Sequence, residues 1–282
     1  MTVHQGQILQ HYQAQIAMTA VDELMTHEQE RDANKPILSH SKLRGEIELR
    51  NVSFSYPGQE NSALNDVSIR IRQGERVGIL GRVGSGKSSL EKLILGLYKP
   101  TVGKIFIDGK HINQIDPGDL RRNIGYIPQD VQLLSGTVFD NITLGIDHPS
   151  DEKLKQAINV SGLAGLVGEQ AEGLAMPVGE AGSKLSGGQR QTIAVARAIM
   201  PDSSILLFDE PTSAMDSALE AHVSRNLKQY SQGKTLLLVT HRTSLLDMVD
   251  RLIVMDGGRI VADGAKQDVL QALDKGTLRR AQ

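Results

Sequence analysis

The sequence has 282 residues, a formal net charge of −2 at pH 7 and a hydrophobic fraction of 39%. This length suits one large domain or two small ones, and a charge so close to zero gives no reason to expect nucleic acid as a partner. The absence of cysteine excludes disulfide bonds and zinc sites built on thiolates.

The first predicted element is a helix over residues 7–28, because apolar side chains recur there every three or four residues. They form one narrow stripe of Leu9, Tyr12, Ile16, Ala20 and Leu24. No window approaches the roughly 20 consecutive apolar residues of a membrane span, and we expect no signal peptide at the N-terminus. The helix either packs on its own domain or ends a longer helix from a preceding domain.

Residues 29–44 are polar and charged and are interpreted as a linker, so the folded domain is expected over residues 45–282. Residues 46–50, 52–56 and 67–71 alternate apolar and polar side chains, as half-buried strands do. We interpret these strands as an antiparallel β subdomain beside the next motif.

The central motif of the chain follows a short apolar strand predicted at residues 76–80. Its pattern is Gly, four residues, Gly-Lys-Ser, which is the spacing of a phosphate-binding P-loop. The residues of this loop are Gly81, Arg82, Val83, Gly84, Ser85, Gly86, Lys87 and Ser88, followed by Ser89. The glycines let backbone N–H groups approach phosphate oxygens, Lys87 supplies positive charge, and the Ser88 hydroxyl can bind Mg2+. A helix predicted at residues 88–96 directs its N-terminus at the anion.

After the P-loop, a strand and turn are predicted at residues 103–109, and Gln129 follows another apolar stretch. Residues 131–200 have helical patterns. Asp151 and Glu152 place negative charge in the first turn of one of these helices, as the helix dipole favours. We expect this region to form a separate helical subdomain.

A second candidate anion site lies about a hundred residues after the P-loop. Its residues are Ser186, Gly187, Gly188 and Gln189, which we call the signature turn. They stand just before a helix predicted at residues 190–199, so a hydroxyl and exposed backbone N–H groups meet a helix N-terminus. One chain therefore carries two phosphate-binding elements.

Two further candidates follow buried strands. Because neighbouring strand residues point to opposite faces, Asp209 and Glu210 can reach one site only if their strand ends there, and Pro211 supports that ending. A second buried strand is predicted at residues 235–240 and leads into His241. The other seven histidines show no spacing typical of a metal site.

In this order and at these intervals, the motifs resemble the nucleotide-binding domain of an ABC exporter over about residues 45–275. The stretch Met176-Pro177-Val178-Gly179-Glu180 is similar to type I secretion ATPases in particular. The resemblance implies an α/β fold, a P-loop NTPase ABC-type ATPase domain with an antiparallel β subdomain and a helical subdomain. It also favours residues 1–28 as the end of a preceding transmembrane domain.

The resemblance implies roles for the site residues. Tyr56 would stack on adenine, and Gln129 would reach both Mg2+ and the attacking water. Asp209 would organise Mg2+ through water, Glu210 would be the general base, and His241 would bind the γ-phosphate. The catalytic set is then Glu210, His241, Gln129 and Lys87, and the Mg2+ ligands are Ser88, Gln129 and Asp209.

In this family the signature turn serves the ATP of a second subunit, so the resemblance implies a homodimer that forms on ATP binding. Asp216 would contact the partner across that dimer, and Glu180 would contact the transmembrane domain of the same transporter. Phe208 and Met215 stand where Leu is usual in the family. We expect the first of these departures to change packing only.

We therefore interpret the chain as an ATP hydrolase, with ATP and Mg2+ bound, that drives export across the bacterial inner membrane, with a polypeptide as the expected substrate of type I secretion. The chain itself would be soluble, on the cytoplasmic face, with a periplasmic adaptor and an outer-membrane channel as partners through the full transporter.

Three alternatives are an importer subunit, a soluble ABC ATPase acting on DNA or ribosomes, and an inactive regulatory module. The N-terminal helix and Glu180 argue against the first. The lack of coiled-coil insertions or a tandem domain argues against the second, and the complete catalytic set argues against the third.

Overall fold

The computed structural model describes residues 2–26, 30 and 42–275. The chain forms two compact units, over residues 1–36 and 37–282. The linker predicted at residues 29–44 lies mostly outside the described residues.

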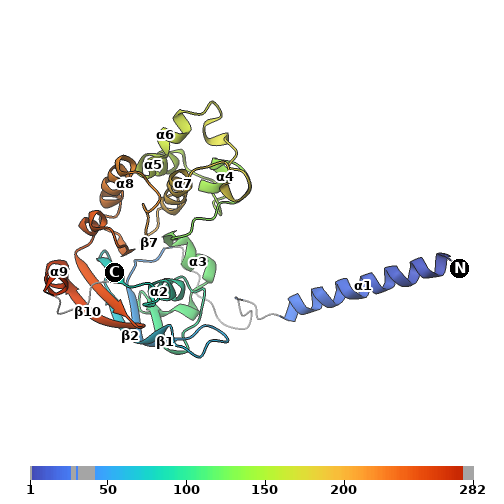
Figure 1. Cartoon of the computed structure of the whole chain (residues 1–282), viewed down its shortest axis with the longest axis horizontal. Coiled ribbons are helices and arrows are strands. Elements are labelled where there is room, and N and C mark those ends of the chain that lie inside the picture. Colours follow the sequence, from blue (N-terminus) through green and yellow to red (C-terminus); the bar gives the residue numbers. More distant parts are fainter. Residues whose placement is uncertain (1, 27–29, 31–41, 276–282) are drawn as a thin grey trace. The chain divides into compact units, whose positions relative to one another are not determined.

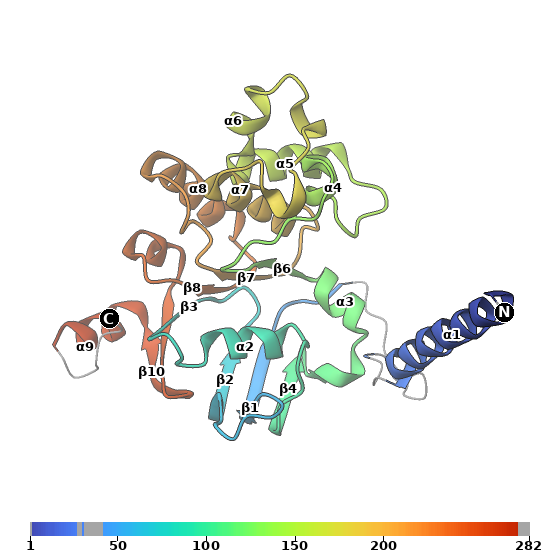
Figure 2. The same cartoon turned by 45° about the vertical axis from the view of Figure 1, so that its right-hand side comes forward.

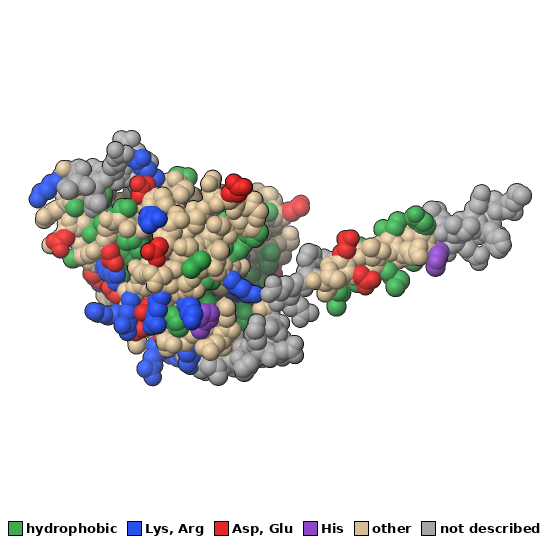
Figure 3. All heavy atoms as spheres, turned by 90° about the horizontal axis from the view of Figure 1, so that it is seen from below, with side chains coloured by type: hydrophobic (Ala, Val, Ile, Leu, Met, Phe, Trp, Pro, Cys, Tyr) green, Lys and Arg blue, Asp and Glu red, His purple; other side chains and the backbone are tan. Residues whose placement is uncertain are grey.

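The first unit contains the helix α1 (Thr2–Thr26). The helix predicted at residues 7–28 thus begins earlier than expected, and residues 27 and 28 lie outside the described residues. Hydrophobic side chains stand out along α1 in Figure 3, and those of Tyr12, Ile16 and Met18 are 60–67% exposed. No helix within the described ranges is long and apolar enough to cross a membrane.

The second unit contains an antiparallel sheet of four strands, which confirms the predicted β subdomain. Its strands are β1 (Ile47–Phe54), β2 (Leu64–Ile71), β4 (Val102–Ile107) and β5 (Lys110–His111). Their order is β2-β1-β4-β5, and every neighbouring pair is antiparallel. The two strands predicted at residues 46–50 and 52–56 form the single strand β1, which carries register shifts after Leu49.

A sheet of six strands forms the centre of the second unit. Its strands are β3 (Arg76–Gly81), β6 (Ile124–Ile127), β7 (Ile205–Asp209), β8 (Thr235–Val239), β9 (Arg251–Asp256) and β10 (Arg259–Ala265). Their order is β10-β9-β3-β8-β7-β6, and all neighbours are parallel except β9 and β10. The strand that leads into the P-loop therefore lies between β8 and β9.

The helices of the second unit cover both faces of the six-stranded sheet. The α-helices are α2 (Lys87–Ile94), α3 (Pro117–Arg122), α4 (Val138–Ile142), α5 (Asp151–Ser161), α6 (Leu163–Gly168), α7 (Gly187–Ile199), α8 (Ser217–Tyr230) and α9 (Lys266–Asp274). The 3-10 helices are η1 (Ile112–Gln114), η2 (Gly173–Ala175), η3 (Glu180–Gly182) and η4 (Thr243–Met248). Figures 1 and 2 show α4 to α8 on one side of the sheet, and α2 with the antiparallel sheet on the other.

The end of helix α2 differs from the prediction for a local backbone reason, whereas the strand and turn predicted at residues 103–109 are found. Helix α2 ends at Ile94, short of the predicted residue 96, because Gly96 adopts a left-handed φ of 68° that terminates a helix. Strand β4 ends at Ile107, because Asp108 and Gly109 both have positive φ and form the tight turn into β5.

Alternate side chains of the buried strands separate two hydrophobic cores. On β7, Leu206 and Phe208 pack among the helices, whereas Ile205 and Leu207 pack with α2 and the antiparallel sheet. Strands β3, β7 and β8 are thus held from both faces, as is usual for parallel strands. Their carboxyl ends lie at one edge of the sheet, where the motif residues follow them.

Candidate active site

The P-loop connects the end of β3 to the start of α2 and wraps around the Lys87 ammonium group. Lys87 is only 9% exposed, and its Nζ donates hydrogen bonds to the carbonyl oxygens of Gly81 (2.7 Å) and Arg82 (2.8 Å). Gly86 has φ 100°, and a Cβ there would lie 2.6 Å from the carbonyl oxygen of Ala63, so only glycine fits. Burial lowers the pKa of Lys87, while nearby carboxylates oppose that shift.

Asp209 and Glu210, at the end of β7, both direct their carboxylates at one site, as the sequence predicted. Strand β7 ends at Asp209, and Glu210 adopts a left-handed φ of 47°. Such a backbone costs a non-glycine residue roughly 1–2 kcal/mol. This turn breaks the strand alternation, so both side chains line the same cavity.

The Glu210 carboxylate is fixed by the end of β8. Its Oε1 accepts a hydrogen bond from the backbone N–H of His241 at 2.5 Å, and its Oε2 accepts one from the Thr240 hydroxyl at 3.1 Å. Glu210 is only 8% exposed, whereas the residue His241 is exposed. The carboxylate therefore has one orientation before any substrate binds.

A third buried carboxyl, absent from the predicted set, belongs to Glu91 on α2. Glu91 is 1% exposed, and one oxygen of its carboxyl group is buried without a hydrogen-bond partner among the described residues. Burial, with the charge of Asp209, raises the pKa of Glu91 to about 9, and burial together with Glu210 raises the pKa of Asp209 to about 6. The pair therefore holds one proton near neutral pH. The sequence carried a signal, because Glu91 lies four residues after Lys87 and so shares its helix face.

Lys87, Asp209 and Glu210 line one cavity of about 360 Å³, and Glu91 lies behind its wall. Among the predicted site residues, its walls include Tyr56, Val83, Gly84, Gly86, Lys87, Ser88, Ser89, Gln129, Asp209, Glu210 and His241. A larger cavity of about 890 Å³ lies beside α3, but none of the predicted site residues lines it. The motif residues, and not the size of a cavity, therefore define the candidate site.

Tyr56, which lines this cavity, belongs to an aromatic cluster. The Tyr56 ring packs edge-to-face against Phe54 and Tyr98, with centroids 4.9 and 5.3 Å away. Its hydroxyl lies 3.1 Å from the Ser89 hydroxyl, and the Lys92 ammonium lies 5.3 Å from the ring centroid. The ring is thus held in place beside the P-loop helix.

The signature turn does not line the P-loop cavity. Ser186 caps α7, since its hydroxyl accepts a hydrogen bond from the Gln189 N–H, and the Gln189 side chain accepts one from the Ser186 N–H. Helix α7 therefore starts at Gly187, three residues earlier than predicted. A Cβ on Gly188 would lie 3.1 Å from the carbonyl oxygen of Ala214, so this turn packs closely on the loop after β7.

Asp216 and Glu180 also lie away from the cavity. The Asp216 side chain caps α8 by accepting hydrogen bonds from the N–H groups of Ala218 (3.0 Å) and Leu219 (2.9 Å). An Asp that precedes a helix is a common N-cap, so the capping role of Asp216 follows from its local sequence. Glu180 is exposed at the start of η3.

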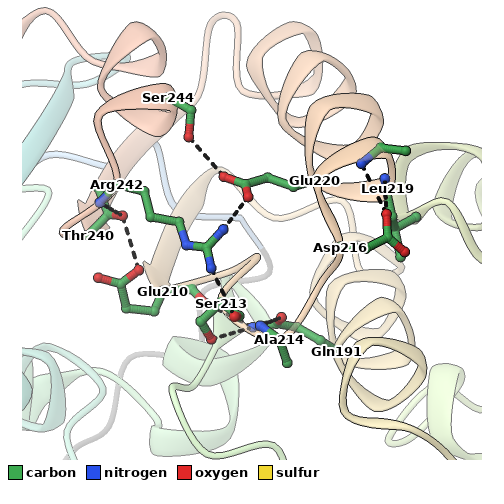
Figure 4. Close-up of polar contacts among 11 residues, drawn as sticks. Gln191, Glu210, Ser213, Ala214, Asp216, Leu219, Glu220, Thr240, Arg242 and Ser244 are labelled. Atoms are coloured by element: carbon green, nitrogen blue, oxygen red, sulfur yellow. Dashed lines mark hydrogen bonds and ion pairs between the residues drawn. The ribbon is translucent and has the colours of Figure 1, made fainter.

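A polar network that the sequence did not indicate joins the end of β8 to the loop after β7 (Figure 4). Arg242 forms an ion pair with Glu220 and donates a hydrogen bond to the carbonyl oxygen of Ser213 at 3.0 Å. Ser244 donates to the other oxygen of Glu220 at 2.8 Å. From the opposite side, the Gln191 amide contacts the same loop.

Comparisons with known proteins agree with this geometry. The family described as ABC transporter matches residues 64–213, more than half of the chain. The chain is 40% identical, over 92% of its length and 36% of the relative, to the toxin RTX-I translocation ATP-binding protein of Actinobacillus pleuropneumoniae. It is 39% identical, with the same coverage, to the alpha-hemolysin translocation ATP-binding protein HlyB of Proteus vulgaris. A solved bacterial Atm1-family ABC exporter with ATP bound matches 92% of this chain and 46% of its own, at 33% identity and a TM-score of 0.84. The chain thus spans about a third of the curated relatives it matches.

Proposed function

The chain belongs to the ABC transporter family, and on that premise we propose that it is the ATP-hydrolysing motor domain of an exporter. One observation carries the proposal: a single cavity gathers the P-loop lysine Lys87, the carboxylates of Asp209 and Glu210, and His241. A phosphate-binding loop with a lysine, next to two carboxylates, is the arrangement that phosphoryl transfer to water needs.

ATP binds with its phosphates in the P-loop. The backbone N–H groups and the N-terminus of α2 favour the anion, and Gly84 at the loop face leaves open space around it. The Lys87 ammonium exchanges the carbonyl oxygens of Gly81 and Arg82 for phosphate oxygens. Tyr56 presents a fixed ring for the adenine at the wall of the same cavity.

The donor set of the cavity fits Mg2+. Ser88, Gln129 and Asp209 line one cavity and offer only oxygen ligands of the kind that Mg2+ prefers. Bound there, Mg2+ supplies positive charge that offsets the charge on the phosphates.

Hydrolysis uses a water molecule and no covalent intermediate. Glu210 orients that water and accepts its proton, a role worth about 10²–10⁴-fold in rate. The Thr240 hydroxyl and the His241 N–H keep the carboxylate in place. The exposed His241 side chain is available to hydrogen-bond the γ-phosphate.

The signature turn acts on the nucleotide of a second copy. Ser186, Gly187 and Gly188 form an anion-binding helix N-terminus that is separate from this chain's own P-loop cavity. Two such chains, head to tail, enclose two ATP molecules, with Asp216 near the contact. ATP binding closes this homodimer and hydrolysis reopens it.

The rest of the transporter is proposed from the relatives. They are toxin and hemolysin translocation proteins, and this chain matches 36% of their length. We assign residues 1–28, with exposed apolar side chains on α1, to the end of a transmembrane domain, residues 29–44 to a linker, and residues 45–282 to the ATPase domain with a helical subdomain at 131–200. The substrate is a polypeptide, exported by type I secretion through a periplasmic adaptor and an outer-membrane channel, with this chain on the cytoplasmic face of the inner membrane.

Phosphate release from Mg-ATP tests the enzymatic part. We expect Lys87→Ala and Glu210→Gln to lower the rate at least about 100-fold, and the exposed matched control Glu172→Gln to leave it within about twofold. Equal rates for Glu210→Gln and Glu172→Gln would contradict the assigned base. The upstream reading frame tests the transporter part, since apolar spans of roughly 20 residues should precede residue 1.

A further inference from the structure

Gln191 is a buried amide with both of its polar atoms in use. It lies in α7, directly after the signature turn, and is 2% exposed. Its Nε2 donates hydrogen bonds to the carbonyl oxygen of Glu210 (2.8 Å) and to the Ser213 hydroxyl (3.1 Å). Its Oε1 accepts one from the N–H of Ala214 at 2.7 Å. An uncharged side chain that both donates and accepts is what this position needs.

The loop contacted by Gln191 is held from its other side by the end of β8 (Figure 4). Ser213 accepts a hydrogen bond from Gln191 at its hydroxyl and one from Arg242 at its carbonyl oxygen. The neighbour of Arg242 is His241, whose N–H binds the Glu210 carboxylate. A path from the catalytic carboxylate to the helix that begins with the signature turn therefore consists of these hydrogen bonds, linked by the covalent bonds between His241 and Arg242 and within Ser213.

We propose that Gln191 is a positioning residue that couples the two nucleotide sites of the dimer. This inference rests on the proposed function, in which Glu210 acts on the chain's own ATP and Ser186 on the ATP of the second copy. Gln191 links the backbone of Glu210 to helix α7, which begins with the signature turn. A movement of Glu210 on γ-phosphate binding or loss is then passed to the signature turn.

The loop at Ser213 and helix α7 are coupled because moving one of them alone costs free energy. A shift of the loop at Ser213 without α7 leaves a buried amide and a backbone N–H unpaired, which a folded interior disfavours strongly. Close packing adds to this, because a Cβ on Gly187 or on Gly188 would lie 3.3 or 3.1 Å from an atom of Ala214, which is tighter than most Cβ contacts. The loop and the signature turn therefore move together.

The test compares Gln191→Met with the matched control Thr192→Val. Methionine keeps the volume of the side chain and removes all three hydrogen bonds. Thr192 is the next residue of α7 and equally buried, but its hydroxyl donates only within the helix, to the carbonyl oxygen of Gln189. Ser213→Ala is a milder second variant, and since Ser213 is exposed it does not threaten folding.

We expect Gln191→Met to lower kcat and weaken the ATP-induced dimer, each by about tenfold, within the range of measured couplings between sites. The Hill coefficient for ATP should fall to about 1, while the Kd of the monomer for a fluorescent ATP analogue stays within about twofold. Ser213→Ala should shift kcat in the same direction by a smaller factor, and Thr192→Val should match the unmodified chain. The dimer is followed in the Glu210→Gln background.

Two failures can be told apart. If Glu210→Gln forms no dimer with Mg-ATP, the proposed sandwich is wrong and the coupling role of Gln191 falls with it. If the dimer forms but Gln191→Met keeps its kcat and Hill coefficient, only the role of Gln191 is overturned. A loss of monomer ATP affinity equal to the loss of kcat would also overturn it, because the residue would then act on one site alone.

Discussion

Glu91 on α2 and Asp209 at the end of β7 are both buried carboxyls, 1% and 5% exposed, and each acts on the pKa of the other. The first belongs to the helix that follows the P-loop, and the second ends a strand of the central sheet. Two carboxyls this close cannot both ionise at low cost. The pair therefore makes the stability of the ligand-free domain depend on pH.

We predict that Glu91→Gln stabilises the domain more at pH 8 than at pH 5. The pKa of Glu91 is raised from 4.5 in the unfolded chain to about 9 in the folded one. Between these values the folded state keeps a proton that the unfolded state loses, so stability falls as pH rises, by up to about 1.4 kcal/mol per pH unit. Glutamine keeps a hydrogen-bond donor but does not titrate. Urea unfolding in EDTA at both pH values measures the difference, and an equal gain at pH 5 and pH 8 would contradict it.

Tyr56 is predicted to aid ATP affinity through its ring and not its hydroxyl. Tyr56→Ala removes the stacking surface and should weaken the binding of ATP by about 1–3 kcal/mol. Tyr56→Phe keeps the ring packed on Phe54 and Tyr98 and loses only the hydrogen bond with Ser89, so its Kd should stay within about fivefold. Titration calorimetry with Mg-ATP and a catalytically slow background variant gives both values. A larger loss in Tyr56→Phe than in Tyr56→Ala would show that the ring does not stack.

We predict that the ion pair between Arg242 and Glu220 stabilises the folded state more than an ion pair on the surface does. Both side chains are partly buried, at 36% and 14% exposure, and Ser244 and Ser213 complete their hydrogen bonds. A double-mutant cycle in urea unfolding should give a coupling of about 1 kcal/mol. The matched pair Arg50 and Glu48 is more exposed, and its coupling should be no more than about 0.5 kcal/mol. Equal couplings for the two pairs would be evidence against a network at this loop.

The sequence predicted those parts of the site that are contiguous in the chain. The P-loop from Gly81 to Ser88 has a fixed spacing between a strand and a helix, so its conformation follows from local chemistry. The break after Asp209 was also predictable, because the alternation of a strand would otherwise send Glu210 to the opposite face. The structure adds the left-handed backbone of Glu210 that makes the break.

The missed residues depend on contacts between distant segments. Glu91 sits between Leu90 and Lys92, in a run that resembles an ordinary amphipathic helix, and only the packing of α2 against β7 shows that it is buried. Gln191 binds Ala214, which is 23 residues away in the chain. Periodicity places a residue on a face of a helix but does not identify what that face meets. The capping of α8 by Asp216 is the opposite case, because an Asp just before a helix is a local signal for an N-cap.

The central claim is that one active site needs two chains, and the most direct test is the specific ATPase activity as a function of protein concentration at saturating Mg-ATP. The account predicts that activity per chain rises with concentration to a plateau, and that Glu210→Gln elutes as a dimer only when Mg-ATP is present. A specific activity that stays constant down to concentrations at which the chain is monomeric would contradict it, because Lys87, Glu210 and His241 would then be sufficient without the signature turn of a second copy.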